Sequence, residues 1–151
     1  MRIWRVARKP HAALNGEGAR LFGARWSSEG IAAIYAASHL SLSAVEYLVH
    51  IDIEDVPDDL VALAIEVPDD VGEDVLVPGD LPVGWRETPA PPVCRAIGDG
   101  WLARKETLLL RVPSVLIPEE MNVLVNPTHP RAGAVRVTLT RSFVYDPRLL
   151  R

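Results

Sequence analysis

The sequence predicts a single domain of the α+β class. The clearest helical pattern comes early, at residues 41–50, whereas strand-like segments crowd the C-terminal half. Helices and strands that are segregated along a chain, and do not alternate, are typical of α+β domains. A chain of 151 residues, 48% of them apolar and 24% charged, is also long and apolar enough to bury one core.

Short patterns define the elements of the first half. Residues 2–8, "RIWRVAR", predict a strand, and the glycine-dense residues 16–30, "GEGARLFGARWSSEG", predict a turn-rich connection. Residues 30–38, "GIAAIYAAS", are short, apolar and begin at a glycine, which favours a buried strand. Residues 41–50, "SLSAVEYLVH", follow a helical repeat that serines can cap. We expect this helix to bury an apolar stripe made of Leu42, Val45, Leu48 and Val49.

Strand patterns dominate the second half. Residues 60–67, "LVALAIEV", alternate as a strand does, and residues 68–100, with six prolines, predict a long irregular segment. Such a segment is either a lid or binding loop, or a surface insertion. In residues 134–140 apolar and polar side chains alternate, so we expect a strand with one solvated face. The strand-like segments after residue 100 are "TLLLRV" (107–112), "SVLI" (114–117), "NVLVN" (122–126), "AVRVTLT" (134–140) and "FVYD" (143–146).

Charge bears on the class of partner. The formal net charge of −4 disfavours nucleic acid as the main partner, because backbone phosphates require a basic face. Residues 1–26 carry six Lys or Arg and one acid, whereas residues 51–80 carry eleven Asp or Glu and no base. The first segment is therefore suited to hold an anion, and the second to repel one.

The sequence also bears on location. It has no run of eighteen apolar residues, and "MRIWRVARKPH" lacks the apolar core of a secretory signal. The single Cys94 has no partner for an internal disulfide, which fits a reducing compartment. We therefore expect a cytoplasmic protein with no membrane partner.

Familiar catalytic motifs are missing. There is no P-loop, no G-x-S-x-G and no H-E-x-x-H, and the spacing in "GEGARLFG" does not fit G-x-G-x-x-G. The four histidines lack metal-ligand spacing, so we expect no metal site.

A sparse set of polar residues remains. Arg25 follows a glycine-rich turn and can grip a phosphate, and Tyr35 can stack on a flat heterocycle. Glu46 falls on the flank of the helical stripe, where a carboxylate can stabilise a sugar cation as a glycosidic bond breaks. Together these three suit a nucleotide with a labile glycosidic bond. Taken singly, each is better explained by an ordinary structural role, and so is Ser114 in its turn.

Several ordered blocks resemble the RES-domain family. They are "GARWSSEGIAAIYAASHLSLSAVEYLVH", "IGDGWL", "LLLRVPSVLIPEEMNVLVNPTHP" and "FVYDPRLL", and they span nearly the whole chain. The arginine, glutamate and serine that name the family map onto Arg25, Glu46 and Ser114. Ala24 and Ser27 depart from the family's glycine and asparagine.

The resemblance implies a RES domain over residues 1–151, with a fold similar to the ADP-ribosyltransferase toxins. It implies the toxin of a bacterial toxin-antitoxin pair that cleaves NAD+ at the nicotinamide ribosidic bond. The acceptor stays open between inorganic phosphate, water and a protein side chain. The implied partner is an Xre-like helix-turn-helix antitoxin that covers the active site, and a homodimer is expected within that complex.

On this basis we expect Arg25 and Glu46 to be catalytic. We expect the dinucleotide to contact Arg25, Trp26, Tyr35, Ser114 and Asn126, although Trp26 suits the core equally well and the alternative role of Ser114 is to orient Glu46. Two alternatives stay open. One is a non-catalytic module whose acidic residues 51–80 dock a basic partner, and the other is an RNA-acting toxin that uses His50 and His129.

Overall fold

Seven strands form one sheet in the order β4-β5-β6-β2-β1-β3-β7 in the computed structural model, which describes residues 1–151. All neighbours are antiparallel except β4 and β5. The strands are β1 (Arg2–Arg8), β2 (Ile34–Ala37), β3 (Leu60–Glu66), β4 (Glu73–Val75), β5 (Leu109–Pro113), β6 (Met121–Val125) and β7 (Arg136–Ser142). The α-helices are α1 (Glu17–Phe22), α2 (Leu40–Leu48) and α3 (Pro92–Arg104).

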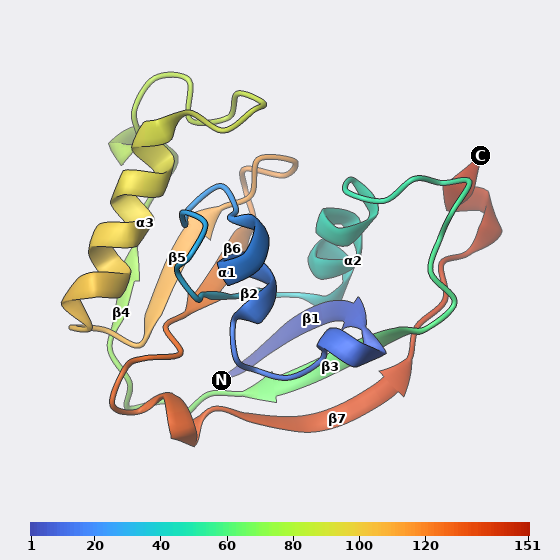
Figure 1. Ribbon diagram of the computed structural model, residues 1–151, viewed down its shortest axis with the longest axis horizontal. Coiled ribbons are helices and arrows are strands. Elements are labelled where there is room, and N and C mark those ends of the chain that lie inside the picture. Colours follow the sequence, from blue (N-terminus) through green and yellow to red (C-terminus); the bar gives the residue numbers. More distant parts are fainter.

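The sheet consists of two halves that meet at one residue pair. Strands β1 and β2 pair only at Trp4 and Ala37, so β1-β3-β7 and β2-β6-β5-β4 run in different directions (Figure 1). Helix α2 lies over β1, and α3 lies beside β4 and β5 (Figure 1). This α+β arrangement confirms the predicted fold class.

Alternation along β2, β5 and β6 creates two cores. Ile34, Leu109 and Val123 face a cluster that includes Ile3 and Leu63. The other face of the same strands packs against α3, in a cluster that includes the following side chains: Trp26, Trp85, Cys94, Trp101, Leu110, Val112 and Leu124. The candidate site lies on this second face.

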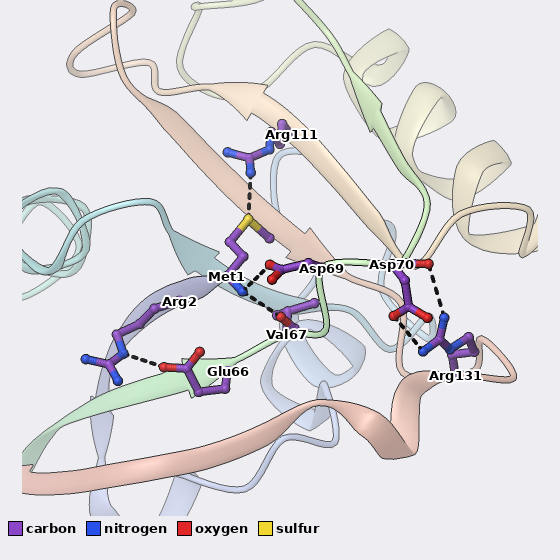
Figure 2. Close-up of polar contacts among 8 residues, drawn as sticks. All are labelled: Met1, Arg2, Glu66, Val67, Asp69, Asp70, Arg111 and Arg131. Atoms are coloured by element: carbon purple, nitrogen blue, oxygen red, sulfur yellow. Dashed lines mark hydrogen bonds and ion pairs between the residues drawn. The ribbon is translucent and has the colours of Figure 1, made fainter.

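A polar network on the first face fixes the start of the chain (Figure 2). The ammonium group of Met1 donates to the Val67 carbonyl at 2.8 Å and to Asp69 at 2.7 Å. Arg111 of β5 pairs with Glu73 at 2.8 Å. Because Arg111 lies opposite Val123 in the ladder, its side chain faces away from the α3 side of the sheet.

The predictions for residues 2–8, 60–67 and 41–50 are confirmed as β1, β3 and α2, with small changes of boundary. The strand predicted over residues 30–38 is the shorter β2. The predicted helical stripe is partly wrong. Val45 is 40% exposed, and the side chains that α2 buries are Leu42 and Ser43.

Residues 68–100 are not wholly irregular, which corrects the prediction. They include β4 and the start of α3, the longest helix. Its prolines occupy the N-cap and first turn, where a missing N–H costs nothing. Gly98 interrupts the helical pattern because the main chain of Trp26 packs directly on it.

Four other expectations are corrected. Residues 16–30 contain the short α1. The segments "SVLI" and "FVYD" are not strands, because Ser114 closes a turn and residues 143–146 lead into a 3-10 helix at Pro147–Leu150. Strand β7 lies at the sheet edge with both faces exposed, and Leu139 is 46% accessible.

Candidate active site

Glu46 lies half-buried on α2, and its carboxylate is held through one oxygen. Oε1 accepts hydrogen bonds from the Ser114 hydroxyl at 2.7 Å and from the Asn122 amide nitrogen at 2.6 Å. No group of the protein donates to Oε2. One oxygen is therefore fixed by the fold, and the other is available to a ligand.

Ser114 is a fully used hydroxyl at the end of β5. Its Oγ accepts from the main-chain N–H groups of Leu116 at 3.1 Å and Ile117 at 3.0 Å, which fills both lone pairs. Its single proton therefore points to Glu46. Because Ser114 is also completely buried, the geometry matches the expectation that it orients Glu46, and not that it touches a ligand.

Asn122 was missed by sequence reasoning. It lies in β6, opposite Ala37 of β2 on one side and Val112 of β5 on the other. Asparagine is disfavoured inside strands, so its place in the apolar run "NVLVN" is the signal that sequence reasoning had available.

Tyr35 shares a sheet face with Asn122. Directly paired residues point to the same side, and Tyr35 pairs with Leu124, two residues from Asn122. Such diagonal neighbours lie roughly 7–8 Å apart. The Tyr35 ring and the Glu46 carboxylate are thus brought to one face.

The Tyr35 hydroxyl is bound to the turn that carries Arg25. It accepts from the Trp26 N–H at 3.2 Å and lies 2.9 Å from the Ser27 hydroxyl. Burial raises the pKa of Tyr35 to about 12, with hydrogen bonds from Ser27 and Trp26 opposing the rise. The phenol is therefore neutral at physiological pH, and the tyrosine positions the turn.

Arg25 is half-buried and bound to a second segment. Its Nη1 donates to the carbonyl oxygens of Trp85 at 2.9 Å and Glu87 at 2.8 Å, and no carboxylate pairs with it. Burial raises the pKa of the neighbouring Cys94 thiol, and the positive charge of Arg25 opposes this rise. Because these hydrogen bonds use Nη1 alone, Nε and Nη2 can bind an anion.

The segment around Trp85 connects the arginine to the glutamate. Arg86 donates from Nε at 3.2 Å and from Nη2 at 2.9 Å to the carbonyl of Val115, next to Ser114. One loop therefore contacts both Arg25 and the turn that orients Glu46.

Trp26 lies in the core, which is one of the two roles that the sequence left open for it. It is 3% exposed and packs among the aromatic side chains beneath α3. Its neighbour Ser28 hydrogen-bonds the Asp99 carboxylate through N and Oγ, at 2.9 and 2.5 Å. These contacts fix the turn on α3, and the burial of Trp26 leaves its ring little surface for a ligand.

Asn126 is not brought to Glu46. It follows the opposite end of β6 from Asn122, roughly 13 Å away at the usual rise per residue. Its amide donates to the Leu102 carbonyl at 3.0 Å and accepts from Thr128 at 2.9 and 3.0 Å. These contacts fit a structural role that connects β6 to α3.

Two further observations concern other classes of site. No three His, Cys, Asp or Glu side chains converge as metal ligands would. None of the helices combines the length and the apolar character needed to cross a bilayer.

The fold and this arrangement define an α+β domain, consistent with the ADP-ribosyltransferase-like type. The fold is similar to that of a chain in the crystal structure of the M. tuberculosis MbcT-MbcA toxin-antitoxin complex, with a TM-score of 0.76 at 21% identity. The alignment covers 99% of this chain and 86% of that one.

Residues 2–146 match the RES domain, so the chain belongs to the RES family. It is 41% identical to a "Prs ADP-ribosylating toxin" of Sphingobium sp. (strain YBL2), over 99% of this chain and 96% of that protein. It is 38% identical to a "Toxin Res" of Yersinia enterocolitica, over 99% of both chains. A "Toxin Res" of Pseudomonas putida is 35% identical, again over 99% of both chains.

Proposed function

We propose that this protein is the toxin of a toxin-antitoxin pair and cleaves the nicotinamide ribosidic bond of NAD+. The observation that carries the proposal is the Glu46 carboxylate, fixed through Oε1 and open at Oε2, on the sheet face that also presents Tyr35. Family membership and relatives named as toxins support it.

The reaction needs a stabilised sugar cation. When the bond between ribose and nicotinamide breaks, its electron pair leaves with the ring nitrogen, and nicotinamide departs neutral. Positive charge then develops on the ribose, where the Glu46 carboxylate stabilises it. An acceptor donates its electron pair to the anomeric carbon and loses a proton.

Arg25 and Tyr35 bind the substrate in this proposal. Arg25 offers Nε and Nη2 to the pyrophosphate or an adjacent ribose, because its Nη1 is already used by the loop. Tyr35 packs beside the nicotinamide end while its neutral hydroxyl holds the turn. Ser114 acts through Glu46.

Inorganic phosphate or water is the proposed acceptor, which makes the enzyme an NAD+ phosphorylase or glycohydrolase. A second candidate is transfer of ADP-ribose to a protein. The Sphingobium relative, 41% identical, is named as an ADP-ribosylating toxin, which favours this candidate.

The proposed partner is an Xre-like antitoxin that covers the active site, with a toxin homodimer inside the complex. Support comes from the similar fold found in a toxin-antitoxin complex. We propose no nucleic-acid target, consistent with the net charge of −4.

One experiment tests the activity and the acceptor together. Purified protein is incubated with NAD+, with and without phosphate, and the products are identified. ADP-ribose 1''-phosphate indicates phosphorolysis, free ADP-ribose indicates hydrolysis, and a modified protein added as acceptor indicates transfer.

Glu46→Gln preserves an acceptor oxygen for Ser114 and Asn122 but removes the charge, so nicotinamide release should fall roughly a hundredfold or more. Growth arrest should disappear with it. Glu54→Gln, on an exposed loop, is the matched control and should behave as the wild type. A Glu46→Gln protein that releases nicotinamide at the wild-type rate would refute the assignment, and growth arrest by that variant would favour the binding-module alternative.

A further inference from the structure

Asn122 makes a 2.6 Å hydrogen bond to Glu46 from a strand, where asparagine is disfavoured. We propose that Asn122 is a positioning residue. With Ser114 it holds Oε1 of Glu46, which assigns Oε2 as the oxygen that faces the reacting sugar. The inference rests on the proposed function and extends it to the residue that sets the carboxylate's orientation.

The direction of the hydrogen bond is fixed by chemistry. A carboxylate oxygen only accepts, so the amide nitrogen of Asn122 must be the atom that faces it. Ser114 has one proton and gives it to the same oxygen. Two donors on one oxygen hold the carboxylate plane in a single orientation, which a lone donor would not do.

Asn122 is a rigid support because of its place in the sheet. Strand β6 is paired on both sides, with β2 and with β5, and Asn122 is in register with Ala37 and Val112. A site group supported by a central strand is more precisely placed than one supported by a loop. Asparagine has a low intrinsic preference for strands. Residues that go against local propensity in this way are expected at functional sites.

Few charged groups surround this contact. Arg86 is bound to the Val115 carbonyl, next to Ser114, and the main chain of Glu120 accepts from the Ser114 N–H. The Glu120 carboxylate lies 3.8 Å from His39, the N-cap residue of α2. No other carboxylate hydrogen-bonds to Asn122 or Ser114, so a new charge at position 122 would act mainly on Glu46.

The test is the pH dependence of nicotinamide release in the full chain. Asn122→Ala should lower kcat about ten- to a hundredfold, the worth of one hydrogen bond to a charged group, with KM for NAD+ little changed.

Asn122→Asp places a second carboxyl group against Glu46, and the pair would share one proton. The acidic limb of its pH-rate profile should therefore move about one pH unit or more toward alkali. Thr140→Asp, on the exposed β7, adds the same charge elsewhere and should keep the wild-type profile.

A readout independent of activity accompanies it. The Tm of Asn122→Asp should fall further below that of the wild type as pH rises, because the two carboxyl groups repel each other once both are ionised. Suppose that the wild type cleaves NAD+ but the pH-rate profile of Asn122→Asp is unshifted and its stability deficit does not change with pH. The positioning role of Asn122 would then be wrong, while the proposed function would stand. If the wild type does not cleave NAD+, the proposed function is wrong. The unfolding series then still tests whether Asn122 contacts Glu46. A stability difference between Asn122→Asp and the wild type that does not change with pH would reject the contact.

Discussion

The main chain of Trp26 lies directly against Gly98 of α3: a Cβ atom at position 98 would be 1.6 Å from the Trp26 carbonyl oxygen. Gly98→Ala would gain about 1 kcal/mol of helix propensity. The clash is with backbone and cannot be relieved by a side-chain rotation, so overpacking of about 1–3 kcal/mol or more should dominate. We predict a lower Tm and, because the Arg25 turn is displaced, a higher KM for NAD+.

Gly100 provides the matched control in the same helix. A Cβ atom there would meet only the flexible end of Arg104, at 3.4 Å. Gly100→Ala should therefore stabilise the protein by about 0.5–1 kcal/mol and leave KM unchanged. If both variants raise the Tm, helix propensity and not the contact with Trp26 governs position 98.

The local stability of the loop at Trp85–Glu87 should depend on its hydrogen bonds with Arg25 and on those that Arg86 makes to the Val115 carbonyl. Arg86→Ala removes both hydrogen bonds to the Val115 carbonyl, while Arg25 still holds the loop through the neighbouring carbonyls. We predict faster proteolytic cleavage within residues 81–91, with little change in Tm because Arg86 is exposed. Arg20→Ala, which removes an exposed pair with Glu17 on α1, should leave the cleavage rate at the wild-type value. Equal cleavage rates in the Arg86 variant and the wild type would contradict this role.

Two tyrosines with raised pKa values predict a loss of stability in alkali. Burial raises the pKa of Tyr35 and of Tyr145 to about 12, whereas an unfolded tyrosine ionises near pH 10. The folded state binds its phenolic protons more tightly, so this contribution is complete below about pH 10 and is lost as pH rises to about 12. At about 1.4 kcal/mol per unit, each tyrosine accounts for roughly 2–3 kcal/mol.

Tyr145→Phe and Tyr35→Phe should each show a smaller fall in the free energy of unfolding between pH 9 and 12 than the wild type, measured by denaturant titration at each pH. Each variant also loses a hydrogen bond, from Tyr145 to the Ala44 carbonyl or between Tyr35 and Trp26, so both start from lower stability. Phenolate absorbance that appears with a midpoint near pH 10 in the folded protein would contradict the raised pKa values.

The fold was predictable from sequence wherever local pattern and tertiary environment agree. Strand β3 is a nearly continuous apolar run, and the structure buries it along its length and pairs it on both sides, so pattern and environment agree. Helix α3 was missed because its glycine has a tertiary cause: Gly98 is required by the main chain of Trp26, far away in sequence. Strand β7 has the alternation of a one-sided strand, but no element covers its apolar face.

The site was only partly predictable for a similar reason. The resemblance of the blocks to a family, and not any spacing, related Glu46 to Ser114, and their 2.7 Å contact matches that expectation. Asn122 was not predicted as a site residue because it lies in a mostly apolar strand and its partner, Glu46, lies on a helix 76 residues earlier. Trp26 was included in the predicted site because it is adjacent to Arg25 in sequence. The two side chains point in different directions, since Trp26 is buried in the core and Arg25 contacts the loop at Trp85.

Ser114 and Asn122 should differ in what their removal costs. Ser114→Ala removes the acceptor of the main-chain N–H groups of Leu116 and Ile117 in a partly buried turn, at about 1 kcal/mol or more of stability. It also removes one of two donors to Glu46, so kcat should fall as well. We therefore predict that Ser114→Ala lowers both the Tm and kcat, whereas Asn122→Ala lowers mainly kcat. Paired unfolding and rate measurements check this, and a Ser114→Ala protein with the wild-type Tm would show that the turn does not depend on its hydroxyl.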